Sequence, residues 1–130
     1  MAVAWFIEDE ADTALDALLD RMQAGEDAIV PGLWPSEFLS ALSNAVRRQR
    51  MEASTLDASI SAVSDLPILI DTQPASVSAL YDLHRRYGVS PYDLCYLELA
   101  LRLGIPLATR DGRLRKAAEE AGVALLPEPR

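Results

Sequence analysis

Apolar residues recur at helical spacing over most of the chain, and short unbroken apolar runs lie between these stretches. Repeats every three or four positions predict helices at Glu10–Ala24, Pro35–Arg50, Ala53–Leu66, Pro74–Tyr87, Ser90–Leu103 and Asp111–Ala121. Short apolar runs bounded by Pro or Gly predict strands at Asp27–Val30, Pro67–Ile70, Ile105–Thr109 and Val123–Leu126. Because strands alternate with helices, the pattern predicts an α/β protein with a parallel sheet and helices on both of its faces.

The start of the helix at residues 90–103 carries a strong local signal. Ser90 can serve as the N-cap, Pro91 as the first helical residue, and Asp93 as the acid of a capping box. Gly104 follows the last apolar residue and ends the helix. The sequence therefore places Asp93 in a first helical turn.

The length of 130 residues fits one domain, residues 1–130, with a core of ordinary size. No apolar stretch is long enough for a transmembrane helix, and the N-terminus MAVAWFIEDE lacks the basic leader of a signal peptide. Cys95 is the single cysteine, so no intrachain disulfide can form, and its apolar neighbours favour a packing role over a nucleophile. We expect a cytoplasmic protein.

The net charge of −8 argues against a nucleic-acid partner, but its distribution weakens that argument. Residues 1–27 hold eight acids and one base, a charge of −7, whereas residues 28–130 hold twelve acids and eleven bases, a charge of −1. Basic residues cluster at 47–50 and at 110–116, and eleven of the twelve bases are Arg, which suits bidentate phosphate contacts. The alternative for each cluster is a solvated helix surface.

Three acids, Glu37, Asp93 and Asp111, each lie at the start of a predicted helix. Each has a structural alternative, because acids in a first turn cap the helix or complement its dipole. Two features favour a functional role. Asp93 shares its helix face with apolar residues, where a carboxylate is costly unless it is paired or binds a metal. Asp111 follows a buried strand, and ligands bind beyond the carboxyl ends of parallel strands. Three converging carboxylates would suit a hard cation, Mg²⁺ or Mn²⁺.

Other chemistries find no support in the chain. His84 is the single histidine and lies beside Arg85 and Arg86, where a partly exposed helix residue is the simpler reading than a catalytic one. A zinc set, a P-loop, a dinucleotide-binding loop and a nucleophile elbow are all absent from the sequence.

The whole chain resembles PIN-domain ribonucleases, specifically the VapC-type toxins of bacterial toxin–antitoxin pairs. The resemblance is carried by AVAWFIEDE at the start, by VPGLWPSEFLSAL around Glu37, by SPYDLCYLELALRLGIPLATRD with Asp93 and Asp111, and by the RL of Arg113 and Leu114. The stretch from Tyr92 to Asp111 is the most specific part.

The resemblance implies a three-layer α/β/α sandwich with the first strand in the middle of a parallel sheet. It also implies Mg²⁺- or Mn²⁺-dependent endonuclease action on RNA, a cognate antitoxin protein that occludes the site, and a homodimer. Glu37, Asp93 and Asp111 match three of the four acidic positions of the family, and Thr109 matches a hydroxyl residue near the last one. By resemblance these three acids are the expected catalytic and metal-binding residues.

The chain departs from the family pattern at its start. In the family a strand ending in Asp-x-Ser precedes the segment that AVAWF resembles, and here Met1 lies within that segment. We therefore expect the first strand and its Asp to be missing, and hypothesise that the natural reading frame starts upstream. Two alternatives to an RNA endonuclease stay open. One is a catalytically impaired PIN-like module that binds RNA or protein, and the other is a phosphohydrolase acting on DNA or a small phosphate ester.

Overall fold

The structure, a computed structural model, describes residues 2–5, 20, 25, 27–109 and 111–126. Its strands are β1 (Ala2–Trp5), β2 (Asp27–Val30), β3 (Ile68–Ile70), β4 (Leu107–Ala108) and β5 (Leu125–Leu126). Its helices are α2 (Trp34–Arg47), α3 (Ala53–Ser64), α4 (Val77–Tyr87), α5 (Pro91–Leu103) and α6 (Gly112–Glu120). The four predicted strands and the last five predicted helices are confirmed, with ends shifted by up to three residues. The predicted helix from Glu10 to Ala24 lies outside the described residues except for Asp20, which is helical.

The five strands form one parallel sheet in the order β3-β2-β1-β4-β5. The central strand β1 pairs with β2 through Ala4 and Ile29 and with β4 through Ala4 and Leu107. The expectation of a missing first strand is therefore wrong. A central strand needs only an extended backbone whose N–H and C=O groups pair with those of its two neighbouring strands. The segment Ala2–Trp5 can therefore occupy the central position of the sheet. Strand β1 itself contains no acid.

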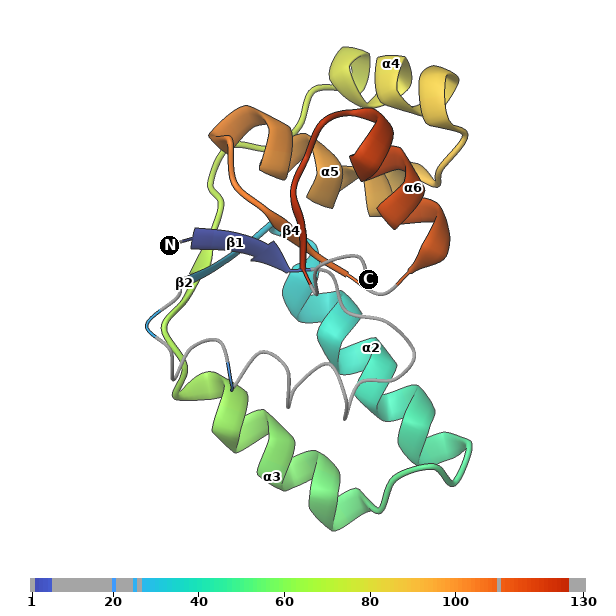
Figure 1. The fold of residues 1–130 in the computed structure, drawn as a ribbon. Coiled ribbons are helices and arrows are strands. Elements are labelled where there is room, and N and C mark those ends of the chain that lie inside the picture. The colour runs from blue at the N-terminus through green and yellow to red at the C-terminus, as the bar shows by residue number, and fades with distance from the viewer. Residues whose placement is uncertain (1, 6–19, 21–24, 26, 110, 127–130) are drawn as a thin grey trace.

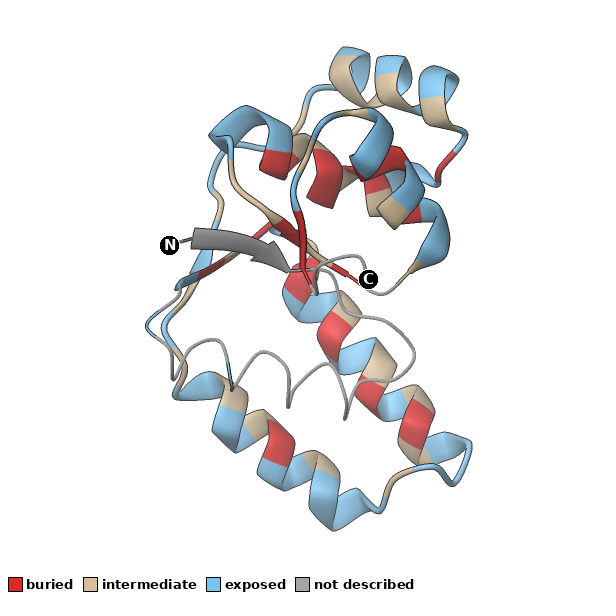
Figure 2. Cartoon of the chain, viewed as in Figure 1, coloured by how far each residue is buried: buried red, intermediate tan, exposed pale blue. Residues whose placement is uncertain are grey.

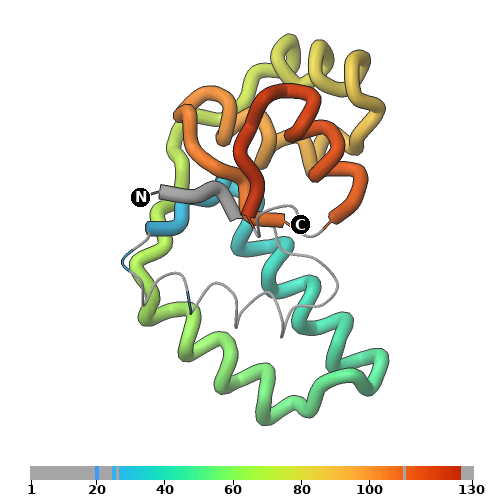
Figure 3. The backbone as a smooth tube through the Cα atoms, in the orientation of Figure 1, coloured from blue at the N-terminus to red at the C-terminus, as the bar shows by residue number. Residues whose placement is uncertain are grey.

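The helices gather in two groups around the strands (Figure 1). Helices α4, α5 and α6 lie together, and α5 packs against both β1 and β4. Helices α2 and α3 pack against each other as a hairpin that extends away from the strands (Figure 3). The α/β class is confirmed. The three-layer sandwich stays a prediction, because the helix predicted at 10–24 lies outside the described residues. Within the described residues, no helix is long and apolar enough to cross a membrane.

The core lies between the sheet and α5, with one stripe of α2 joining it (Figure 2). Helix α5 supplies five buried side chains, at Leu94, Tyr96, Leu97, Leu99 and Ala100. This helix is therefore apolar on more than one face, as expected for a helix covered by the sheet on one side and by α4 and α6 on others. Its position is fixed by packing, and so is the position of Asp93 in its first turn.

Helices α4 and α5 differ in how their first turns are capped. Helix α4 begins at Val77 instead of Pro74, because the Ser76 hydroxyl accepts a hydrogen bond from the Ala79 N–H (3.0 Å) and fixes the N-cap there. Ser90 is the N-cap residue of α5 as predicted, but its side chain makes no capping hydrogen bond. The predicted end of α5 is confirmed, since Gly104 adopts the left-handed conformation (φ +66°) that ends helices.

Candidate active site

The three predicted acids lie on segments that meet at the carboxyl-end edge of the sheet. Strand β2 leads through residues 31–33 into α2, which carries Glu37 in its first turn. Strand β4 leads through Thr109 to Asp111, the residue immediately before α6. Helix α5 packs on β1 and β4 and carries Asp93 in its first turn. This edge is where ligands bind in open parallel sheets.

Glu37 lies half-buried on α2, and its electrostatic environment disfavours the charged form. Burial raises the pKa of Glu37 to about 7, and the negative charge of Asp93 adds to this effect. A hydrogen bond from the Tyr96 side chain acts in the opposite direction. The carboxyl group of Glu37 is therefore close enough to Asp93 for their charges to interact, although the two residues belong to different helices.

Asp93 is also half-buried, and burial raises its pKa. The second cause is repulsion from Asp111 at the start of α6. Asp93 thus interacts electrostatically with both other acids. Three carboxylates from α2, α5 and the β4–α6 connection consequently share one electrostatic environment.

The turn that carries Asp111 is held by a set of short hydrogen bonds. The Asp111 N–H donates to the hydroxyl of buried Thr109 (3.1 Å), and Oδ2 of Asp111 accepts from the Leu114 N–H (2.9 Å). The Arg115 guanidinium donates to the Thr109 carbonyl (2.6 Å). The N-cap role considered for Asp111 is therefore real, but it occupies one carboxylate oxygen, and a carboxylate has a second that can bind a cation. Thr109 orients the backbone of this turn.

Helix α5 brings two further polar side chains towards the acids. Tyr96 is fully buried, and its pKa is raised by burial and by the nearby charge of Glu37. Cys95 is half-buried, and burial, Glu37 and Glu98 raise the pKa of its thiol. A thiol with a raised pKa is a poor nucleophile, which agrees with the packing role expected for Cys95.

The donor chemistry at this edge suits a divalent cation. Half-buried carboxylates that repel one another are oxygen ligands for a hard ion, and an ion would relieve both the burial cost and the repulsion. Within the described ranges, no three His, Cys, Asp or Glu side chains are grouped tightly enough to enclose a metal.

The predicted basic clusters differ in their distance along the chain from the acids. Arg47 ends α2, about 15 Å along the helix from Glu37 at 1.5 Å per residue. On α6, Arg113 and Lys116 are exposed just after Asp111. The α6 cluster is therefore closer along the chain to an acid.

His84 is exposed on α4, and its Nδ1 lies 2.8 Å from the Val89 carbonyl, so it is tied to the backbone as a structural residue.

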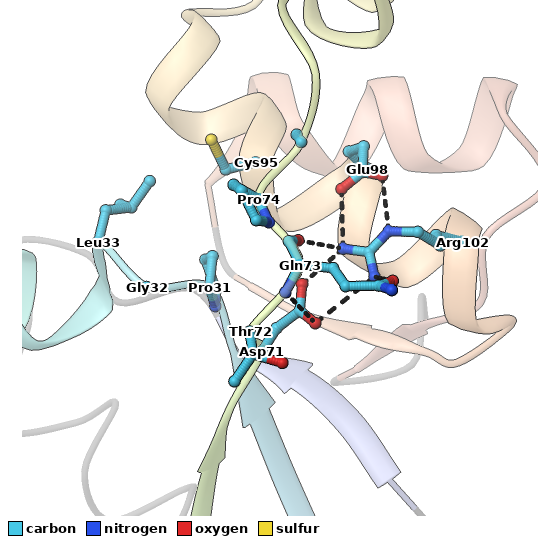
Figure 4. Close-up of a pocket in the computed structure, with 11 residues that line it drawn as sticks. Pro31, Gly32, Leu33, Asp71, Thr72, Gln73, Pro74, Cys95, Glu98 and Arg102 are labelled. Atoms are coloured by element: carbon cyan, nitrogen blue, oxygen red, sulfur yellow. Dashed lines mark hydrogen bonds and ion pairs between the residues drawn. The ribbon is translucent and has the colours of Figure 1, made fainter.

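A pocket lies beyond the ends of β2 and β3 (Figure 4). It is lined by residues 31–33, residues 71–75 and three side chains of α5, Cys95, Glu98 and Arg102. Arg102 crosses the pocket wall and bonds Asp71 (2.5 Å) and Glu98 (2.8 Å), as Figure 4 shows. These ion pairs lower the pKa of Asp71 and raise that of Arg102. They fasten the segment after β3 to α5.

This Arg102 network was not predicted from the sequence. The spacing of Glu98 and Arg102, four residues apart on a helix, would have indicated their pair. No sequence signal connects Arg102 to Asp71, which lies 31 positions away and meets it through the fold.

Comparison with known proteins identifies the family. A PIN-domain family model matches residues 1–120, so the chain belongs to the PIN-domain family. The fold is similar to that of the crystal structure of PAE2754 from Pyrobaculum aerophilum, with a TM-score of 0.69 and 20% identity over 98% of this chain and 93% of that one. No match was found among curated protein sequences. PIN domains are typically metal-dependent nucleases, and the predicted family is confirmed at this level.

Proposed function

We propose that this protein is a metal-dependent endoribonuclease and acts as the toxin of a type II toxin–antitoxin pair. The observation that supports the proposal best is the electrostatic coupling of Glu37, Asp93 and Asp111 at the carboxyl-end edge of a PIN-domain sheet. Carboxylates such as those of Glu37 and Asp93, whose pKa values are raised in such a position, are typical of functional sites.

The three acids would together hold Mg²⁺ or Mn²⁺, with Asp93 in the middle because it interacts with both of the others. When bound, the ion polarises a phosphoryl oxygen and lowers the pKa of a water for in-line attack. Glu37, with a pKa of about 7, holds its proton below neutral pH and gives it up when an ion binds. Ion affinity should therefore rise with pH. Thr109 and Arg115 keep the Asp111 turn in place through the hydrogen bonds described above.

The toxin role, the antitoxin and a homodimer follow from the resemblance to VapC-type proteins. An antitoxin that silences the enzyme would cover the acidic edge, and an Arg placed among the carboxylates would satisfy their charges in place of the ion. Co-purification of this chain with the product of a neighbouring small reading frame, followed by loss of RNA cleavage in the complex, would test this role.

A cleavage assay tests the enzymatic proposal. Labelled single-stranded RNA and a DNA oligonucleotide of the same sequence are incubated with the protein and Mg²⁺ or Mn²⁺. We expect RNA to be cut, and Asp93→Asn to slow cutting by more than about 100-fold, because outer-shell changes alone cost about 10–100-fold. Asp82→Asn, at an exposed acid of α4, is the matched control and should leave the rate unchanged. Preference for DNA would support the phosphohydrolase alternative.

The second candidate is a PIN-like binding module without turnover. It is favoured because β1 contains no acid, whereas the family pattern has an Asp at the end of its first strand. Comparing this chain with a form extended by an Asp-x-Ser segment separates the two. RNA binding without cleavage by either form would support the binding module.

A further inference from the structure

Helix α5 presents an exposed aromatic ring directly beside the central acid of the site. Tyr92, the second residue of α5, is 72% exposed, whereas the next residue, Asp93, is half-buried. Successive residues point about 100° apart around a helix. The Tyr92 side chain therefore leaves the helix about 100° around its axis from the Asp93 side chain, so the ring does not cover the carboxylate, although the two residues are adjacent in the first turn of α5.

Isolated exposed apolar side chains are common on protein surfaces, so exposure alone does not indicate a site. The position of Tyr92 distinguishes it from the other large exposed apolar residues among those described, which are Leu39, Leu69, Ile70, Val77, Tyr81, Leu101 and Leu103. None of these is next in sequence to one of the three acids. Tyr81, the other aromatic ring in this group, lies on α4 beneath the Arg85 guanidinium (5.6 Å).

We propose that the Tyr92 ring is a stacking platform for an unpaired base next to the phosphate that the enzyme attacks. This inference rests on the proposed function. Aromatic side chains bind single-stranded RNA by stacking on the faces of the bases, and any base can stack. A base joined to a phosphate held at Asp93 lies within one nucleotide of that position, which matches the place of Tyr92 beside Asp93.

Basic side chains near Asp111 extend the proposed path. Arg113 and Lys116 are exposed on α6, which begins just after Asp111, and they can contact the neighbouring phosphates of the strand. The strand would then run from Tyr92 on α5, past Asp93 and Asp111, to the first turns of α6. Bases in a duplex are already stacked and paired, so a Tyr92 platform selects single-stranded RNA.

RNA binding in EDTA tests the platform without any cleavage. The dissociation constant of a labelled single-stranded RNA of about 12 nucleotides, a typical site length, is measured by fluorescence anisotropy. Tyr92→Leu, which keeps an apolar side chain, should raise the dissociation constant about tenfold. Tyr92→Phe, which keeps the ring, should stay within about twofold of wild type, and Tyr81→Leu is the matched control at a distant ring.

The outcomes separate this inference from the nuclease proposal. Equal binding by wild type and Tyr92→Leu, or a loss as large with Tyr92→Phe as with Tyr92→Leu, would overturn the platform. If the wild-type protein cuts RNA with Mn²⁺ although either of these binding results is found, the nuclease proposal stands without the Tyr92 platform. Absence of RNA binding by wild type would also overturn the platform, whereas a selective loss with Tyr92→Leu supports it even if no cleavage is found.

Discussion

Replacing Glu37 with Gln should stabilise the metal-free protein at alkaline pH. Gln has nearly the same shape, but it carries no charge to bury beside Asp93. The pKa of Glu37 rises from an ordinary 4.5 to about 7 on folding. At about 1.4 kcal/mol per pH unit, this difference of roughly 2.5 units sets an upper bound of about 3.5 kcal/mol on the cost of the charge. Because the side chain is only half-buried, solvent screening reduces the expected gain to about 1–2 kcal/mol.

The sign of the pH dependence follows from proton binding. Between pH 4.5 and 7 the folded chain binds more protons at Glu37 than the unfolded chain, so this group makes stability fall as pH rises through that range. The destabilisation is complete above about pH 7 and disappears below about pH 4.5. The gain from Glu37→Gln should therefore be large at pH 8.5 and small at pH 4.5.

Urea denaturation at both pH values measures the difference in the free energy of unfolding. Glu119→Gln, at an exposed site of α6, is the matched control and should change stability by less than about 0.5 kcal/mol at either pH. Added Mn²⁺ should stabilise wild type at pH 8.5 more than Glu37→Gln, because an ion that binds the folded state raises its stability. A pH-independent gain, or a loss at pH 8.5, would refute the assigned environment of Glu37.

Three further predictions concern the supports of the site. Asp111→Ala should lower the free energy of unfolding by about 1 kcal/mol in urea denaturation, because the cap of α6 is lost. Asp111→Ser should keep the wild-type free energy of unfolding and still abolish RNA cleavage. RNA cleavage by Asp111→Ser at the wild-type rate would assign Asp111 a structural role alone. Arg102→Met should lower the free energy of unfolding by about 1 kcal/mol at low salt. The loss should be smaller in 1 M NaCl, because the ion pairs to Asp71 and Glu98 are partly exposed. A loss that is the same at both salt concentrations would indicate that Arg102 stabilises the fold by packing instead. Gly104→Ala should lower stability by about 1 kcal/mol because the residue adopts φ +66°, and an unchanged melting temperature would contradict this.

Sequence reasoning located the helices and strands well because their signals are local. The periodicity of α5 and the positive-φ glycine after it fix that helix from residues 90–104 alone. The place of β1 could not be predicted in this way. Four residues, Ala-Val-Ala-Trp, carry little signal of their own, and their central position depends on pairing with β2 and β4.

The candidate site also combines local features that the sequence predicts with long-range contacts that it does not. The types and helix positions of Glu37, Asp93 and Asp111 could be read from the sequence, as could the half-buried surroundings of Asp93. The coupling between them could not, because it depends on how α2, α5 and α6 approach one another. The Arg102 tie to Asp71 was missed for the same reason.

The pairing of β1 with β4 has a consequence for the newly made protein. It joins residues near the amino terminus to residues about a hundred positions later, Ala4 to Leu107 and Trp5 to Ala108, and such distant contacts form slowly. A nascent chain still held on the ribosome before β4 has emerged lacks both that partner strand and Asp111. The three acids can therefore come together only after the segment that carries β4 and Asp111 has been synthesised and has joined the sheet.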